Sequence, residues 1–161
     1  ALAYHLNAYN ALVLFNVLEH PGLESVNDQL LDFFYLSTFR LDGDPINLYD
    51  LENEVVRGYG DARIHFALNC ASAGCPRLPQ EPFLGDRLQE QLAHETARFL
   101  AEPRNVTVRD GELTLSAIFD WYAEDFPPNP ETWILQHRAG QLPPFDGVRY
   151  RDYDWDLNAQ R

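Results

Sequence analysis

Three residues that could together carry out acyl chemistry lie within nineteen consecutive positions: Glu52, His65 and Cys70. A thiol is a strong nucleophile only as the thiolate, and a neighbouring imidazole can take up its proton. The imidazole in turn needs a third group, usually a carboxylate or an amide, that fixes its tautomer. These residue types therefore predict Cys70 as nucleophile, His65 as general base and Glu52 as the group that orients the imidazole.

The residues around Cys70 are small, and this suggests where a developing negative charge could be held. Backbone N–H groups in the run Ala71 to Gly74 could converge on an oxyanion, and we add Asn69 and Ser72 as candidate oxyanion or substrate contacts. One geometric condition applies. Residues five apart are about 16 Å from each other in a strand and rise about 7.5 Å along a helix. His65 can therefore reach Cys70 only if the chain bends between them.

Less reactive interpretations of the same residues stay open. A cysteine in an apolar run is more often an inert core residue than a nucleophile, and His65 could be a hydrogen-bonded core residue. Cys70 and Cys75 could form one local disulfide or remain two free thiols. Their spacing from His65 fits zinc poorly, because zinc pairs usually stand two to four residues apart and no fourth ligand is near. We predict no metal and no cofactor.

Helical and extended patterns alternate along the chain without a repeat. Apolar residues at three- and four-residue steps predict helices over 1–18, 48–57 and 85–101. The aromatic run 33–41 predicts a strand, and 106–115 predicts a hairpin around Asp110-Gly111. The segment 62–70 is either a strand or a short buried helix. Caps at Asn47, Ser116 and Asn129 begin helices, and the tail from 150 to 158 is expected to be extended.

This mixture predicts an α+β fold in which several helices pack on a small antiparallel sheet. The 161 residues are enough for one compact domain, so we assign 1–161 to a single domain.

The charge of the chain excludes some classes of partner. There are 25 acidic residues against 12 Lys and Arg, all of them Arg, which gives a net charge of -13. Nucleic acids and anionic membrane surfaces are bound through clustered cations, so neither is expected as a partner. No run of 18 apolar residues occurs, and we expect no membrane insertion of this domain. The sequence does not determine the oligomeric state.

Five motifs occur in order along nearly the whole chain: LNAYNALVL, LYDLENEVVR, DARIHFALNCASAGCPRL, LSAIFDWYAEDF and YDWDLN. Together they resemble the domain-of-unknown-function family number 547. The resemblance implies a fold similar to papain-like and transglutaminase-like cysteine enzymes and a Cys-His-Glu site on Cys70, His65 and Glu52. Plant-like members have serine where this chain has Cys75, which favours Cys70 as the nucleophile.

The resemblance also bears on the remaining motifs. Asn7 and Asn10 match the family's N-A-Y-N motif. The Asn7 amide could donate to an oxyanion, or both amides could tie the helix to nearby backbone groups. Asp154, Trp155 and Asn158 match the terminal motif and are interpreted as structural closure of the domain. Bacterial members are often exported or anchored, which implies a periplasmic or extracytoplasmic location with any signal segment upstream of this chain.

The sequence thus leads to two hypotheses of different kinds. The first is a hydrolase or acyltransferase that acts on an amide, peptide or thioester bond of a small-molecule or peptide substrate. The second is a binding or scaffolding module that keeps an enzyme-like fold without turnover, since a fold does not by itself imply a function.

Overall fold

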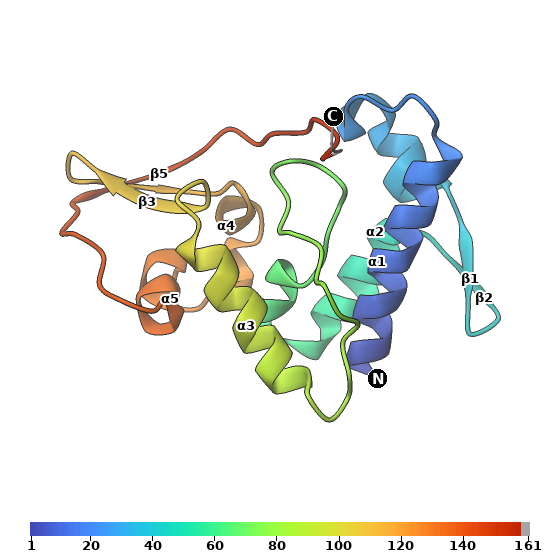
Figure 1. Ribbon diagram of the computed structural model, residues 1–161, viewed down its shortest axis with the longest axis horizontal. Coiled ribbons are helices and arrows are strands. Elements are labelled where there is room, and N and C mark those ends of the chain that lie inside the picture. Colours follow the sequence, from blue (N-terminus) through green and yellow to red (C-terminus); the bar gives the residue numbers. More distant parts are fainter. Residues whose placement is uncertain (159–161) are drawn as a thin grey trace.

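A long N-terminal helix forms one side of the protein in the computed structural model, which describes residues 1–158 (Figure 1). This helix, α1, covers Leu2–Glu19. Its buried residues recur at three- and four-residue steps, as expected for a helix with one face on the core. It matches the helix predicted over 1–18 and ends at His20, before Pro21 and Gly22, where Gly22 adopts a φ of 88°.

The segment that follows α1 corrects one prediction. The aromatic run does not start as a strand: a 3-10 helix, Val26–Gln29, leads to a π-helical turn, Asp32–Leu36, and strand β1 covers only Phe39–Leu41. This turn buries the Phe33 side chain completely in the core, so burial of this aromatic residue does not require a strand. A turn at Asp42-Gly43, both with positive φ, connects β1 to β2, Asp44–Ile46, and the two strands pair antiparallel.

Helical turns then carry the chain through the centre of the sequence. Helix α2, Leu48–Asp50, continues into a π-helical segment, Leu51–Val56, and a 3-10 turn, Arg57–Tyr59. The Asn47 side chain accepts the backbone N–H of Asp50 at 2.7 Å, which confirms the predicted cap. The segment left open between strand and helix is a buried 3-10 helix, Ala62–Phe66.

The second half of the chain combines helices with a sheet. Helix α3 covers Leu88–Ala101, α4 covers Ile118–Trp121, a 3-10 turn covers Ala123–Asp125 and α5 covers Pro130–His137. The predicted hairpin is confirmed as β3, Val106–Arg109, with β4, Glu112–Leu115. Strand β5, Gly147–Tyr150, joins β4 in parallel, so this sheet is mixed rather than wholly antiparallel. The cap at Asn129 is also confirmed.

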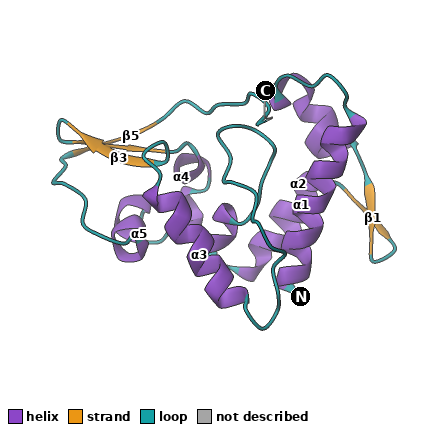
Figure 2. Ribbon diagram, viewed as in Figure 1, coloured by secondary structure: helices purple, strands orange, loops and turns teal. Residues whose placement is uncertain are grey.

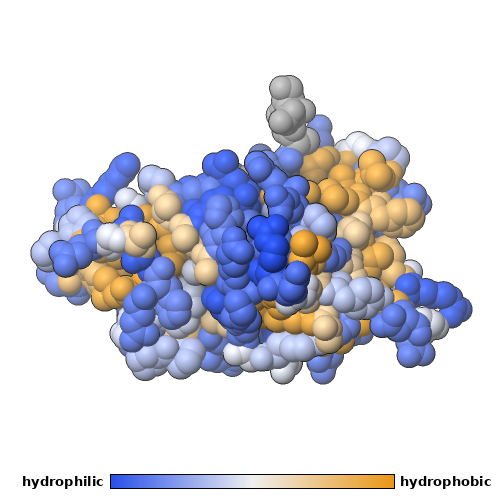
Figure 3. Space-filling view, turned by 60° about the horizontal axis from the view of Figure 1, so that its bottom comes forward, coloured by the Kyte–Doolittle hydropathy of each residue, from blue (hydrophilic) through white to orange (hydrophobic). Residues whose placement is uncertain are grey.

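Two hydrophobic clusters form the core, and the two small sheets of residues 1–158 lie at opposite ends of the molecule (Figure 2). One cluster gathers α1 and the turns that follow it, and the other gathers α3, α5 and the β3–β4 hairpin. The predicted α+β class is confirmed. In Figure 3 hydrophilic residues cover the middle of the visible face, and hydrophobic residues show at its two ends.

The C-terminal segment closes the structure, as its motif predicts. After β5 the chain crosses back to the far end of α1 (Figure 1), where Ser25 pairs with Asp156 and Ser72 pairs with Leu157. Its carbonyls also accept backbone N–H groups from Ala73 and Gly74 at 2.8 Å. The loop that contains both cysteines is therefore held by the tail. Among the described residues no helix is long and apolar enough to cross a bilayer.

Candidate functional site: a cavity lined by aromatic rings and a cysteine pair

The two cysteines form a disulfide, which settles the alternative that the sequence left open. Cys70 and Cys75 are bonded, with their Cα atoms 6.0 Å apart. Cys75 is only 4% exposed, whereas Cys70 is partly exposed. In this state neither sulfur is a thiol. Cys70 is available as a nucleophile only after reduction.

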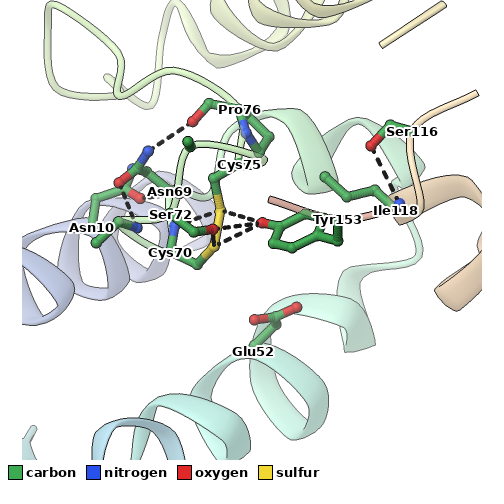
Figure 4. The surroundings of a disulfide bond; sticks show 12 residues. Asn10, Glu52, Asn69, Cys70, Ser72, Cys75, Pro76, Ser116, Ile118 and Tyr153 are labelled. Atoms are coloured by element: carbon green, nitrogen blue, oxygen red, sulfur yellow. Dashed lines mark hydrogen bonds between the residues drawn. A yellow bond between two sulfur atoms is a disulfide. The ribbon is translucent and has the colours of Figure 1, made fainter. Parts of the chain in front are cut away.

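Asparagine side chains hold the loop that contains the disulfide (Figure 4). The Asn69 amide donates to the carbonyl of Pro76 at 2.7 Å and accepts the N–H of Ala71 at 3.0 Å. Asn10 of α1 accepts the backbone N–H of Asn69 and donates to the carbonyl of Ala67, both at 2.9 Å. These amides satisfy buried backbone groups where the chain bends. The chain leaves its helical turn between His65 and Cys70, and Asn69 helps to hold the loop that follows.

Asn7 has the structural role that we named as the alternative to oxyanion binding. Its amide donates to the carbonyl of Phe83 at 2.9 Å and accepts the N–H of the same residue at 2.8 Å. It ties α1 to the loop before α3, and it is not among the residues that line the cavity described next.

A cavity of about 450 Å³ lies beside the disulfide and brings the three predicted catalytic residues together. Cys70, His65 and Glu52 all line it. Most of the other lining side chains are aromatic: Tyr9, Phe34, Tyr35, Tyr49, Trp121, Tyr122, Tyr153 and Trp155. This volume is in the range of small-molecule sites, which are usually apolar with a few convergent polar groups.

Two hydroxyl groups lie against the disulfide (Figure 4): Tyr153 lines the cavity, whereas Ser72 is fully buried and is not among the lining residues. The Ser72 hydroxyl lies 3.0 Å from Sγ of Cys70 and 2.8 Å from the Tyr153 hydroxyl. The Tyr153 hydroxyl is 3.1 Å from Sγ of Cys70 and donates to Sγ of Cys75 at 3.2 Å. Burial is the main cause that raises the pKa of Tyr153 to about 12, so its hydroxyl stays protonated near neutral pH. It is therefore a donor to sulfur.

His65 is buried at the cavity wall, with its Nε2 atom 2.7 Å from Oδ2 of Asp125. Its ring stacks on Tyr122 with centroids 4.2 Å apart. Burial lowers the pKa of His65 and outweighs the bond to Asp125, which acts in the opposite direction. The imidazole is then neutral at pH 7. Because the carboxylate can only accept, Nε2 carries the hydrogen and Nδ1 carries the free lone pair of a base.

The predicted partner of this imidazole is corrected by the structure. Glu52 does not hold His65: its Oε2 accepts from the Tyr9 hydroxyl at 2.8 Å and its Oε1 from the Tyr122 hydroxyl at 2.6 Å. Burial is the first cause that raises the pKa of both tyrosines, followed by the nearby Glu52 charge. Glu52 therefore fixes two rings of the cavity wall, and one of these rings supports His65.

Asp125 occupies the position expected of Glu52, and it is held in place by an arginine. Arg57 donates to both oxygens of Asp125, at 2.8 and 3.1 Å, and to Glu124 at 2.6 Å. Burial works to raise the pKa of Asp125, but the bonds from Arg57 and His65 prevail and leave it below its usual value. Asp125 is thus ionised and oriented.

Sequence reasoning missed Asp125, Arg57 and Tyr153 as members of the site. All three lie in motifs that carry the family resemblance, Arg57 at the end of LYDLENEVVR, Asp125 in LSAIFDWYAEDF and Tyr153 in YDWDLN, and those motifs were the signal that could have found them. Spacing offered none, because Asp125 is 60 positions from His65 and Tyr153 is 83 from Cys70.

The site contains a cysteine, an imidazole and a carboxylate, but in the disulfide state these groups are not arranged for nucleophilic attack. Among residues 1–158 no hydrogen bond joins His65 to Cys70, whose sulfur is bonded to Cys75. Within the same residues no group of three or more His, Cys, Asp or Glu side chains is arranged to hold a metal ion.

Comparison with known proteins yields one match. The family model described as "Protein of unknown function, DUF547" matches residues 1–100, which contain α1, Glu52, His65 and both cysteines. No curated protein and no solved structure matches the chain.

Proposed function

This chain belongs to the DUF547 family of proteins of unknown function, and we propose that its aromatic cavity is the active site of a cysteine-dependent hydrolase or acyltransferase. The observation that carries the proposal is the meeting of Cys70, His65 and Glu52 at one cavity. Under this proposal the domain is a relative of papain-like and transglutaminase-like enzymes. A location outside the cytoplasm is part of the same proposal, supported by the disulfide, which persists in oxidising compartments.

The proposed reaction begins with the reduced chain. The Cys70 thiol gives its proton to Nδ1 of His65, and the thiolate attacks the carbonyl carbon of an amide, peptide or thioester. His65 then returns the proton to the leaving nitrogen or sulfur. Water or an amine attacks the acyl-enzyme in a second step and releases Cys70. Asp125 holds Nε2–H throughout and stabilises the imidazolium that forms.

A hydroxyl group next to Cys70 is suited to the oxyanion of this reaction. Tyr153 lines the cavity 3.1 Å from Sγ of Cys70, near the carbon that the sulfur would attack, and the buried Ser72 hydroxyl lies 2.8 Å from the Tyr153 hydroxyl and can orient it. O–H donors aimed at a developing oxyanion are among the largest contributions to acyl transfer. Glu52 acts as a positioning residue in this account, because it holds Tyr122 under the imidazole.

An activated ester tests the proposal directly. Fully reduced protein mixed with p-nitrophenyl acetate should release a burst of close to one nitrophenolate per chain, and peptide mass spectrometry should place the acetyl group on Cys70. Cys70→Ser should abolish the burst and Cys75→Ser should keep it. His65→Ala should slow acylation by roughly 10²- to 10⁴-fold.

The matched control is His94→Ala, since His94 is an exposed histidine on α3. It should leave the burst unchanged. An acetyl group found elsewhere, or a burst that survives Cys70→Ser, would reject Cys70 as the nucleophile.

A second candidate function is ligand binding without turnover. It is favoured by the disulfide, which occupies Cys70, and by the aromatic lining of the cavity. Trp121 and Trp155 line this cavity, so a ligand should change their fluorescence. The enzyme proposal requires reduction for activity. A binding module should instead take up the same ligand equally well when oxidised and when both thiols are absent, as in the double variant Cys70→Ser with Cys75→Ser.

A further inference from the structure

The disulfide is placed where a small molecule in the cavity would touch it. Both cysteines line the cavity, yet they differ in accessibility: Cys70 is partly exposed and Cys75 is 4% exposed. A thiol attacks a disulfide sulfur along a path that must be open. Of the two cysteines that line the cavity, Cys70 is the more exposed and is therefore the one that an entering thiol can reach.

The buried sulfur, Sγ of Cys75, accepts hydrogen bonds that would stabilise it as a leaving thiolate. Sγ of Cys75 accepts the backbone N–H of Cys70 at 2.9 Å and the Tyr153 hydroxyl at 3.2 Å. Ser72, at 2.8 Å, can in turn donate to the Tyr153 oxygen. Hydrogen bonds to a thiolate lower its pKa, and a leaving thiol of lower pKa departs faster.

We infer that the Cys70–Cys75 disulfide exchanges with low-molecular-weight thiols that enter the cavity, with Cys70 as the sulfur attacked and Cys75 as the leaving thiolate. The cavity of about 450 Å³ suits such a molecule. This activity belongs to the oxidised chain, whereas the proposed acyl chemistry belongs to the reduced chain. It therefore holds whether or not Cys70 attacks carbonyl compounds.

The exchange balances in two steps. A thiolate RS⁻ attacks Sγ of Cys70, a bond between the two sulfurs forms, and the Cys70–Cys75 bond breaks to leave Cys75 as thiolate, which takes up the proton that the thiol lost. A second thiolate then attacks the RS sulfur and releases Cys70. Overall, two thiols are oxidised to one disulfide, and the cysteine pair gains two electrons and two protons.

The test follows the oxidised protein in reduced glutathione at pH 7, with samples quenched by iodoacetamide at increasing times. Peptide mass spectrometry should find an early species with glutathione on Cys70 and carbamidomethyl on Cys75, formed while circular dichroism shows folded protein. Glutathione on Cys75 instead, or no adduct until the chain is unfolded by denaturant, would overturn the inference. This readout uses the unchanged protein and needs no variant.

A variant isolates the stabilisation of the leaving sulfur. Tyr153→Phe keeps the ring that packs on Trp121 and Trp155 but removes the donor. It should slow the first step by about three- to tenfold, in line with one lost hydrogen bond. Tyr150→Phe, at an exposed tyrosine of β5, should leave the rate unchanged. Equal rates in the two variants would contradict the role given to Tyr153.

Discussion

The protonation of His65 decides what this cavity can do near neutral pH. The imidazole is buried and hydrogen-bonded to Asp125, a carboxylate that also binds Arg57. Burial lowers the pKa of His65. A base that is neutral at pH 7 and has a free Nδ1 is ready to accept a proton, whereas a charged imidazole would not be.

This environment predicts how the His65 ring titrates. Its pKa, followed by NMR of the ring protons, should lie below the usual value of about 6.5. Asp125→Asn should lower it further, because the carboxylate favours the charged form. Asp120→Asn, at an exposed aspartate of α4, should have no such effect. A His65 pKa above the usual value would contradict a buried neutral base.

The lowered pKa of His65 also makes the stability of the folded protein depend on pH. A histidine whose folded pKa is below its unfolded pKa favours folding fully above about pH 6.5, and this contribution is lost as the pH falls. The lowered pKa of Asp125 acts in the same direction, at pH values near and below about 4. Both groups therefore make the folded state less stable in acid.

Residue types could be predicted from the sequence better than their partners. Cys70, His65 and Glu52 were selected by chemistry, and they do line one cavity. The partner of His65 could not be predicted from spacing, because Asp125 reaches it only when the 3-10 turn Ala123–Asp125 packs beside Ala62–Phe66. Sequence spacing therefore favours Glu52, which is close to His65 along the chain, whereas Asp125 is close to it in space.

At the scale of elements, the π-helical segment Leu51–Val56 positions Glu52 between two tyrosines. Tyr9 of α1 and Tyr122 both donate to this carboxylate, and Tyr9 is only 1% exposed. A buried hydroxyl that loses its acceptor costs about 1–3 kcal/mol. Glu52 therefore links the two halves of the core through its hydrogen bonds to the two tyrosines.

Removal of the Glu52 carboxylate should destabilise the folded protein. Glu52→Ala should lower the free energy of unfolding by about 2–4 kcal/mol, since two hydroxyls lose their partner at once. Glu54→Ala lies on the exposed side of the same segment and should leave this free energy nearly unchanged. Urea unfolding followed by tryptophan fluorescence would compare them. Equal stabilities in the two variants would refute the structural role of Glu52.

Gly74, the glycine between Cys70 and Cys75, should not tolerate a larger residue. A Cβ atom there would lie 2.8 Å from Cε2 of Tyr153 and 3.0 Å from the carbonyl oxygen of Asp154. Gly74→Ala should therefore destabilise the protein by about 1–3 kcal/mol, because the tail must move. The control is Gly58→Ala, where no atom lies within 4 Å of the added Cβ. If Gly74→Ala unfolds at the same temperature as Gly58→Ala, the tail does not pack as described.

Local sequence patterns predict some elements better than others. The hairpin and the caps at Asn47 and Asn129 were predictable because the residues that form them are adjacent and their hydrogen bonds are local. The run from Phe33 was predicted as a strand because aromatic residues favour strands. Its first part is helical instead, since that turn buries Phe33 and places Phe33 O next to Asn16. Such tertiary contacts override propensity.

At the scale of the whole molecule, the stability of the fold rests on its two clusters rather than on the disulfide. The clusters contain most of the large buried side chains, and the disulfide closes a loop of only five positions. A loop this short stabilises the native state by about 2 kcal/mol through chain entropy. The cysteine pair can therefore take part in a reaction without being required for the fold.

Reduction should leave a folded protein. With a phosphine reductant the free energy of unfolding should fall by about 2 kcal/mol while the circular dichroism spectrum is retained. The double variant Cys70→Ser with Cys75→Ser should not respond to the reductant. Loss of the folded state on reduction would mean that the clusters cannot sustain the fold alone, and that the thiol form required for acyl chemistry does not exist as a folded enzyme.

The central claim, that His65 activates Cys70 across this cavity, is tested most directly by the rate of Cys70 alkylation against pH. Iodoacetamide would be used on the Cys75→Ser variant, in which Cys70 is the one thiol of the chain, with and without His65→Ala. We predict an apparent pKa well below about 8.5 that returns to that value or above it when His65 is removed. A slow reaction with an unshifted pKa, indifferent to His65, would contradict the account and favour the binding module.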